Sequence, residues 1–193
     1  MRAGAIVYTS CTGHTQRYAH MLGRAAELPV LELKEAGLAP NTPVIYLGWL
    51  MAGGVKGLKQ ARKRFDVQAV CAVGMALPEQ VDREKLARDN GLDARTPLFY
   101  LRGGYAPRQL PALYKAVMAP MARTVARRPA ETETDRQMKE AFAAGGCWIT
   151  EEQLAPVLAG KSGQAGVYRR GMGNGVWQRN KSTGRSGPSP PLF

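Results

Sequence analysis

The chain has 193 residues, of which 45% are hydrophobic and 22% charged, and its formal net charge is +12. This length supports one well-filled core, and no apolar run approaches the roughly 20 residues that a membrane-spanning helix needs. The three cysteines are far apart and the chain has only two histidines, so no disulfide framework, zinc site or iron–sulfur site is indicated. Redox chemistry would therefore need an organic cofactor. The N-terminus does not resemble a signal peptide, and we expect a cytoplasmic protein.

The positive charge is unevenly distributed along the chain. Residues 160–193 contain six basic residues and no acidic residue, so half of the +12 lies in this segment. The segment is also rich in Gly, Ser and Pro and has no hydrophobic period. We therefore expect residues 159–193 to form a basic, disordered tail, and residues 1–158 to form the folded domain.

Five short apolar runs predict β-strands in the first hundred residues. Four of them are nearly continuous in apolar residues and rich in Val, Ile, Tyr or Phe, as in strands that helices cover on both faces. The predicted strands are Gly4–Ser10, Leu28–Leu33, Pro43–Leu50, Val67–Ala76 and Pro97–Arg102.

Helical periodicity appears between these strands and after the last one. Helices are predicted over residues 15–27, 57–64, 82–90, about 133–144 and 151–158. A longer helix should follow the fifth strand, with a kink at Pro120. Its apolar face consists of Leu110, Leu113, Tyr114, Val117, Met118, Met121 and Val125.

Strands that alternate with helices predict right-handed crossovers and a parallel sheet between two helical layers. The number and spacing of the strands favour an α/β, flavodoxin-like three-layer fold. Its five-stranded parallel sheet should have the order 2-1-3-4-5. In such a sheet, ligands bind outside the carboxyl ends of the strands, near the point where the strand order reverses.

The loop after the first predicted strand suits a bound phosphate. It consists of Ser10, Cys11, Thr12, Gly13, His14 and Thr15. Its hydroxyl and backbone N–H groups precede a helix, whose N-terminus favours an anion, and Gly13 allows the backbone to approach closely. An ordinary Ser/Thr helix cap is the alternative interpretation.

Two further regions at the same edge are expected to contact a flat aromatic ring. Residues 48–54 form an apolar run that includes Trp49, Leu50, Met51, Ala52 and Gly53, and such a run is unusual if it faces only water. A Trp packed on the protein's own surface is the alternative. The second region contains Gly74 and Met75 after strand 4, and Arg102, Gly103, Gly104 and Tyr105 after strand 5. Arg102 is expected to offset charge on a reduced ring or a substrate, although Gly residues after a strand also form ordinary turns.

These motifs resemble those of a known family. "IVYTSCTGHTQRYA" resembles the flavin mononucleotide (FMN) loop of flavodoxins, except that His14 replaces the usual Asn. "YLGWLMAGG" and "YLRGGY" fit the flavin-facing loops. Tyr105, Tyr114, Met118, Met121 and "ETETDRQ" resemble the C-terminal part of flavodoxin-domain proteins related to menaquinone-dependent protoporphyrinogen dehydrogenase. The resemblance covers about residues 3–158.

The resemblance implies a noncovalently bound FMN that transfers electrons, with a quinone or a porphyrinogen among the expected substrates. Two features depart from the family. Ordinary flavodoxins are acidic, whereas this chain is basic, which favours an acidic redox partner, an anionic substrate or peripheral contact with an anionic membrane. The long insertion expected after strand 3 in the quinone-linked enzymes is also not evident.

Two other functions remain open at this level. Cys11 and Arg17 have the C-x5-R spacing of a low-molecular-weight phosphatase or arsenate-reductase-like enzyme, with a thiolate nucleophile and a phosphate-binding arginine. No Asp-Pro occurs in the chain to provide the acid that this chemistry needs, so the phosphatase is the less favoured alternative. A third hypothesis is nucleic-acid binding through the basic tail, with Tyr168 and Trp177 stacking on bases.

Overall fold

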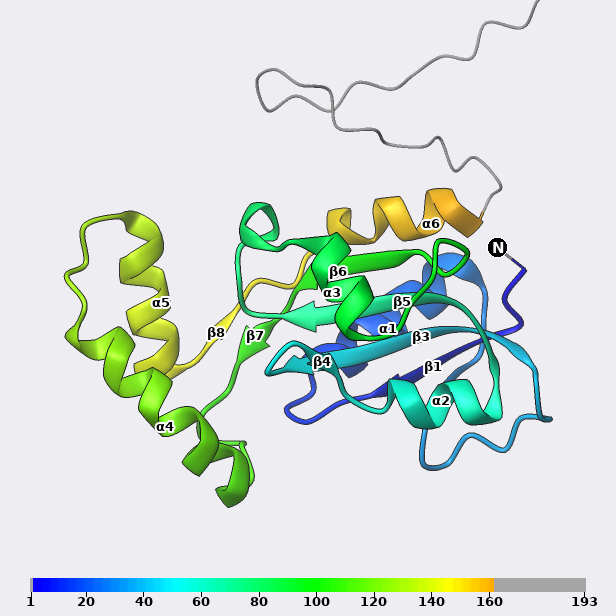
Figure 1. Ribbon diagram of the computed structural model, residues 1–193, viewed down its shortest axis with the longest axis horizontal. Coiled ribbons are helices and arrows are strands. Elements are labelled where there is room, and N and C mark those ends of the chain that lie inside the picture. The colour runs from blue at the N-terminus through cyan, green and yellow to red at the C-terminus, as the bar shows by residue number, and fades with distance from the viewer. Residues whose placement is uncertain (1, 162–193) are drawn as a thin grey trace, which may run out of the picture.

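The computed structural model describes residues 2–161, which form an α/β body and a projecting pair of helices (Figure 1). The last helix ends at Lys161, so the predicted disordered tail lies outside the described residues beyond that point. The strands are β1 (Ala5–Thr9), β2 (Val30–Glu32), β3 (Pro43–Met51), β4 (Gly54–Val55), β5 (Asp66–Gly74), β6 (Leu98–Arg102), β7 (Gly104–Tyr105) and β8 (Gly146–Cys147). The helices are α1 (His14–Ala26), α2 (Leu58–Arg64), α3 (Arg83–Asp89), α4 (Ala112–Arg127), α5 (Glu133–Ala144) and α6 (Ala155–Lys161), with short 3-10 turns at Pro78–Gln80 and Glu152–Leu154.

The central sheet has the strand order β2-β1-β3-β5-β6, and all four pairings between these neighbours are parallel. Counted along the chain without β4, this is the order 2-1-3-4-5, which confirms the predicted flavodoxin-like α/β fold. The strand order reverses between β1 and β3. The carboxyl ends of these two strands therefore define the edge where a ligand is expected.

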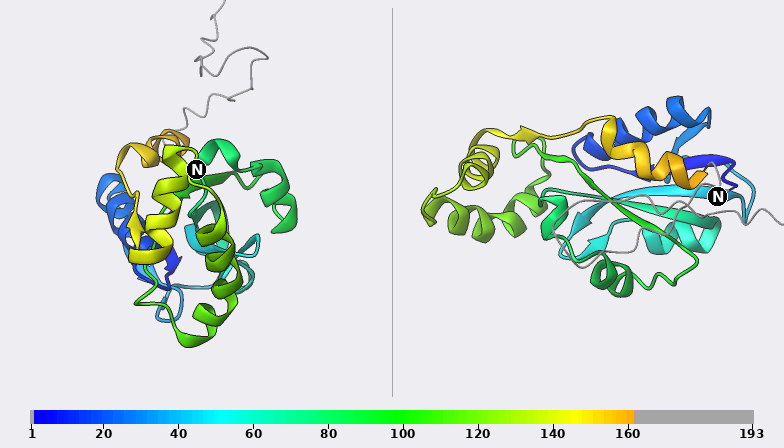
Figure 2. Two further views of the ribbon diagram at one scale, coloured as in Figure 1. Left: turned by 90° about the vertical axis from the view of Figure 1, so that its left-hand side faces the viewer. Right: turned by 90° about the horizontal axis from the view of Figure 1, so that it is seen from above.

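Helices cover both faces of the sheet. Figure 2 shows α1 and α6 on one side and α2 and α3 on the other. Successive residues of β1 point to opposite faces, so Ile6 packs with Tyr18 and Leu22 of α1, whereas Val7 packs with Leu58 of α2. Because both faces are buried, the strand is apolar at nearly every position, and this made it easy to predict.

The segment predicted as a loop after strand 3 is a β-hairpin. Strand β3 extends to Met51, and the chain then reverses through Ala52 and Gly53 into the short antiparallel strand β4. Ala52 and Gly53 both have positive φ (48° and 77°), as a two-residue hairpin turn with the twist of its strands requires. The strand predicted to end at Leu50 therefore extends one residue further, to Met51, and pairs with a short strand that was not predicted.

The helices α4 and α5 form a hairpin that projects from one end of the body (Figure 1). The two-stranded ribbon of β7 and β8 joins the hairpin to the body. Helix α4 continues through Pro120, and none of its residues is buried. The apolar face predicted for this segment is real but only partly covered, because Leu113, Val117 and Met121 are 70%, 51% and 53% exposed.

Candidate functional site at the carboxyl edge of the sheet

The loop between β1 and α1 has the geometry of an anion site. Gly13 precedes the helix with φ 84°, a left-handed conformation that other residues rarely adopt, and its N–H donates to Ser10 Oγ at 3.1 Å. No side chain caps the N-terminus of α1. The first N–H groups of the helix and the hydroxyls of Ser10 and Thr12 are therefore suited to an external anion.

His14 connects this loop to the end of β6. Thr12 Oγ1 lies 3.0 Å from His14 Nδ1, and a Cβ atom on Gly104 would lie only 2.3 Å from His14 Nε2. The imidazole thus packs directly on the Gly104 backbone. Burial, and to a lesser extent the charge of Arg17, lowers the pKa of His14 below 6.5. The ring is therefore neutral at pH 7 and adds no fixed positive charge to the loop.

Cys11 and Arg17 do not show the features of a thiolate nucleophile and a phosphate-binding arginine. Burial raises the pKa of the Cys11 thiol above 9.0, which favours the neutral thiol. Arg17 is exposed, and its Nη1 lies 3.2 Å from Cys147 Sγ, on strand β8. A helix N-terminus alone therefore does not produce a thiolate here.

The hairpin of β3 and β4 is held by contacts within the protein. The Trp49 ring packs edge-on against Tyr114 of α4, with centroids 5.1 Å apart and planes at 83°. Lys56 Nζ lies 5.9 Å from the Trp49 centroid. At the hairpin tip, Asn90 Nδ2 donates to the Gly53 carbonyl at 2.8 Å, so Gly53 is held beside the end of α3.

The ends of β3, β5 and β6 meet closely. The Gly103 N–H donates to the Gly74 carbonyl at 2.7 Å, which joins the ends of β5 and β6. A Cβ atom on Gly74 would lie 2.7 Å from Tyr100 Oη and 3.1 Å from Leu50 Cδ1. Gly74 therefore permits a close approach between β3 and β6, and Met75 follows it as a half-buried side chain.

The guanidinium of Arg102 is partly buried and has no acidic partner among the described residues. Its Cζ lies 4.1 Å from the centroid of the Trp148 ring, and its Nε and Nη2 are buried with no hydrogen-bond partner among the described residues. The Arg102 backbone is fixed by Gln153 Oε1, which accepts from its N–H at 2.7 Å, and by the Tyr18 hydroxyl, which donates to its carbonyl at 2.7 Å. Buried donors without acceptors are costly, so the site favours an added acceptor.

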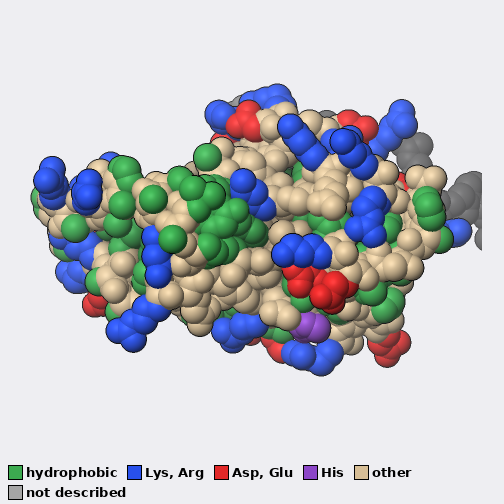
Figure 3. All heavy atoms as spheres, turned by 90° about the horizontal axis from the view of Figure 1, so that it is seen from below, with side chains coloured by type: hydrophobic (Ala, Val, Ile, Leu, Met, Phe, Trp, Pro, Cys, Tyr) green, Lys and Arg blue, Asp and Glu red, His purple; other side chains and the backbone are tan. Residues whose placement is uncertain are grey.

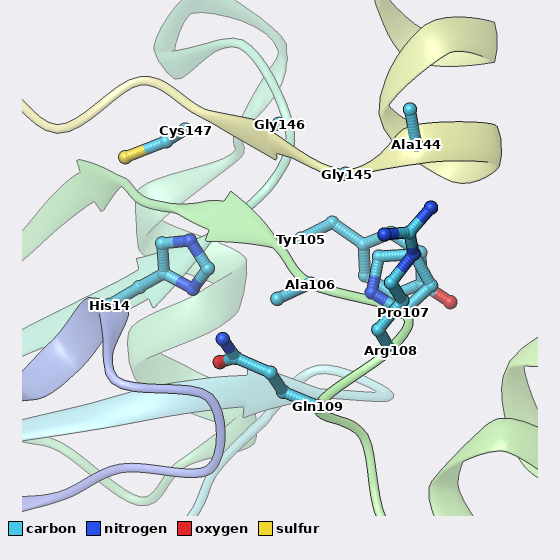
Figure 4. Close-up of a pocket in the computed structure, with 10 residues that line it drawn as sticks. All are labelled: His14, Tyr105, Ala106, Pro107, Arg108, Gln109, Ala144, Gly145, Gly146 and Cys147. Carbon is cyan, nitrogen blue, oxygen red and sulfur yellow. The ribbon is translucent and has the colours of Figure 1, made fainter.

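A cavity of about 360 Å³ lies between the start of α1 and the β7–β8 ribbon (Figure 4). His14 and Gln109 point into it from opposite sides, and Tyr105, Gly146 and Cys147 contribute to its walls. Its volume is within the range of small-molecule sites, which begins at about 300 Å³.

The structure brings most of the predicted site residues to one edge, in two adjoining groups. Residues 10–15 lie against residues 103–105 through His14, while Gly74 joins Gly103 and Leu50. Ala52 and Gly53 are exposed at the hairpin tip. Sequence reasoning missed Gln109, Cys147, Trp148 and Gln153. The glycine pair at residues 145–146 was the sequence feature that could have indicated this part of the site. Gly146 pairs with Tyr105 across the ribbon and so brings this segment to the predicted edge.

Comparison of the chain with protein-family models, curated proteins and solved structures gives no match. The function is therefore argued from the residues and their geometry. Among residues 2–161, no helix combines the length and the apolar character needed to cross a membrane.

Proposed function

We propose that the protein is an FMN-binding redox protein whose loop at residues 10–15 holds the cofactor phosphate. The observation that carries the proposal is the uncapped N-terminus of α1, with Gly13 in the left-handed conformation directly after β1. This anion site lies where the strand order reverses, the usual ligand position in a doubly wound sheet. The oxygens of a phosphate match the hydroxyl and N–H donors at this position.

The flavin ring would lie beyond the phosphate, along the ends of β3, β5 and β6. Three half-buried apolar side chains lie there, those of Leu50, Met51 and Met75. Gly74 has no side chain that would separate the backbone from the ring. The unpartnered donors of Arg102 would offset the negative charge of the reduced ring. When bound, FMN supplies the electron-transfer chemistry, while the protein positions the ring and excludes water from one side.

The basic charge supports an anionic redox partner or substrate. The formal net charge of +12 would attract such a partner and accelerate its association at low salt. The cavity beside His14 adjoins the phosphate loop and would admit a small molecule from solvent. A quinone or a porphyrinogen remains a proposal that comes from the family resemblance alone.

The geometry favours this function over the phosphatase alternative. That enzyme needs a Cys11 thiolate, but burial raises the pKa of this thiol. It also needs Arg17 at the phosphate, whereas Arg17 contacts Cys147. The nucleic-acid hypothesis depends on Tyr168 and Trp177, which lie outside the described residues.

The experiment titrates cofactor-free protein with FMN and measures binding by the quenching of flavin fluorescence. Two hydroxyl contacts to a charged phosphate should make Ser10→Ala with Thr12→Val bind about a hundredfold more weakly or worse. Cys11→Ala should leave the affinity nearly unchanged. Thr124→Val with Thr134→Val is the matched control, because both residues lie on the helical hairpin. Wild-type aryl-phosphate hydrolysis that disappears in Cys11→Ala would instead establish the phosphatase.

A further inference from the structure

Helix α4 carries an exposed stripe of apolar side chains on the surface of the described residues. Leu113, Val117 and Met121 are the three large hydrophobic side chains there that are mainly exposed. They follow one another at intervals of four residues and therefore span about 80° of the helix surface. Apolar side chains aligned in this way on a projecting helix indicate a contact surface.

One edge of this stripe borders side chains of α4 that already have partners. Tyr114 packs on Trp49, and α4 lies against α5 along the hairpin. At 3.6 residues per turn, Tyr114 lies about 20° beyond Met121 at this edge, whereas Leu113 lies about 100° from Tyr114. The three side chains of the stripe nevertheless stay mainly exposed in the described part of the chain.

Basic residues border the Leu113 edge of the exposed stripe, and acidic residues are absent from this part of the sequence. Residues 94–130 contain seven Lys or Arg and no Asp or Glu. Arg123 and Arg127 are exposed, and at 3.6 residues per turn they lie within about 80° of Leu113, on the side away from Tyr114. Figure 3 shows hydrophobic side chains at the hairpin end of the molecule, with Lys and Arg side chains around them.

We propose that α4 binds the surface of a membrane that contains anionic lipids. Leu113, Val117 and Met121 would enter the boundary between headgroups and acyl chains, while Arg123 and Arg127 would contact lipid phosphates. The helix is about 24 Å long and has a polar side, as a helix lying in the interface requires. The positive charge of the arginines complements anionic lipid headgroups. Because the arginines and the exposed apolar stripe belong to the same helix, a lipid surface can contact both at once. This binding does not depend on a flavin cofactor.

The test is cosedimentation of the full chain with lipid vesicles at low and moderate salt. One set of vesicles contains phosphatidylglycerol and phosphatidylcholine, and the other contains phosphatidylcholine alone. We expect binding to the anionic vesicles that weakens as salt rises. The variant Arg123→Glu with Arg127→Glu should bind at least about tenfold more weakly. Lys59→Glu with Lys63→Glu is the matched control, since it makes the same charge change at the same spacing on α2 and should lose much less binding.

The apolar stripe is tested separately with Leu113→Gln, Val117→Gln and Met121→Gln combined. These positions are exposed, so the variant should fold, and circular dichroism checks this. We expect it to lose most vesicle binding while keeping the wild-type spectrum. Failure of the wild type to bind anionic vesicles at low salt would overturn the proposal. A lipid-free dimer that the same variant dissociates would also overturn it, because a second copy would then cover the stripe.

Discussion

The contact between Trp49 and Tyr114 links the sheet edge to the helical hairpin, and a double-mutant cycle measures its strength. The two rings meet edge-on with centroids 5.1 Å apart, an arrangement that aromatic pairs prefer. Trp49→Ala and Tyr114→Ala each remove the contact, and the double variant removes both rings. Both side chains are half-buried, so the variants should remain folded.

We expect a coupling free energy of about 0.5–1.5 kcal/mol between the two rings. Trp49→Ala should be the more destabilising single change, because it also removes the contact with Lys56, worth about 0.5–1 kcal/mol at an exposed site. Trp49→Phe retains an aromatic ring and should recover part of the loss.

The free energy of unfolding is measured by urea denaturation with circular dichroism for all four proteins of the cycle. Additive effects, within about 0.3 kcal/mol, would show that the rings do not stabilise one another and would refute the reasoning. The same proteins separate the two interpretations of Trp49. If it also stacks on a flavin, FMN affinity should fall about three- to tenfold in Trp49→Ala and remain near wild type in Tyr114→Ala.

Three other perturbations test the site. Gly104→Ala should destabilise the protein by about 1–3 kcal/mol in urea denaturation, because the added Cβ would lie 2.4 Å from the Gly146 carbonyl oxygen, a backbone atom. The lowered pKa of His14 means that the unfolded chain binds its proton more readily, so stability should fall as pH drops below 6.5. His14→Asn should remove that part of the pH dependence between about pH 7.5 and 5.5. Because burial raises the pKa of Cys11, the rate of its alkylation in a Cys147→Ser background should keep rising with pH up to and beyond pH 9.0, and a rate that already levels off near pH 7 would contradict the neutral thiol.

The body of the fold could be predicted because its signals are local and strong. Strands such as β1 are buried on both faces and are therefore apolar throughout, and the helices between them carry a clear stripe. The order of the sheet then followed from the crossover rule and the number of strands. The short strands β4, β7 and β8 have two residues each, which is too few for any periodicity to appear.

The two helices of the α4–α5 hairpin could be predicted, but their projection from the body could not. The residues Leu113, Val117 and Met121 have the spacing of a core-facing stripe, and spacing alone does not distinguish a face that packs inside from one that stays exposed. The loop at residues 10–15, the proposed phosphate site, could be predicted because its residues are contiguous. The Arg102 environment was not, because Trp148 and Gln153 lie about fifty residues further along the chain.

The visible absorption spectrum of the purified full chain shows directly whether the protein binds FMN. The protein is mixed with excess FMN, passed through a desalting column and compared with Ser10→Ala combined with Thr12→Val. We expect a yellow wild type that retains about one flavin per chain and a nearly colourless variant, because the proposed phosphate contacts come from the uncapped start of α1 and the adjacent hydroxyls. A wild type that emerges colourless, with the fold intact by circular dichroism, would contradict the claim that this edge of the sheet is an FMN site.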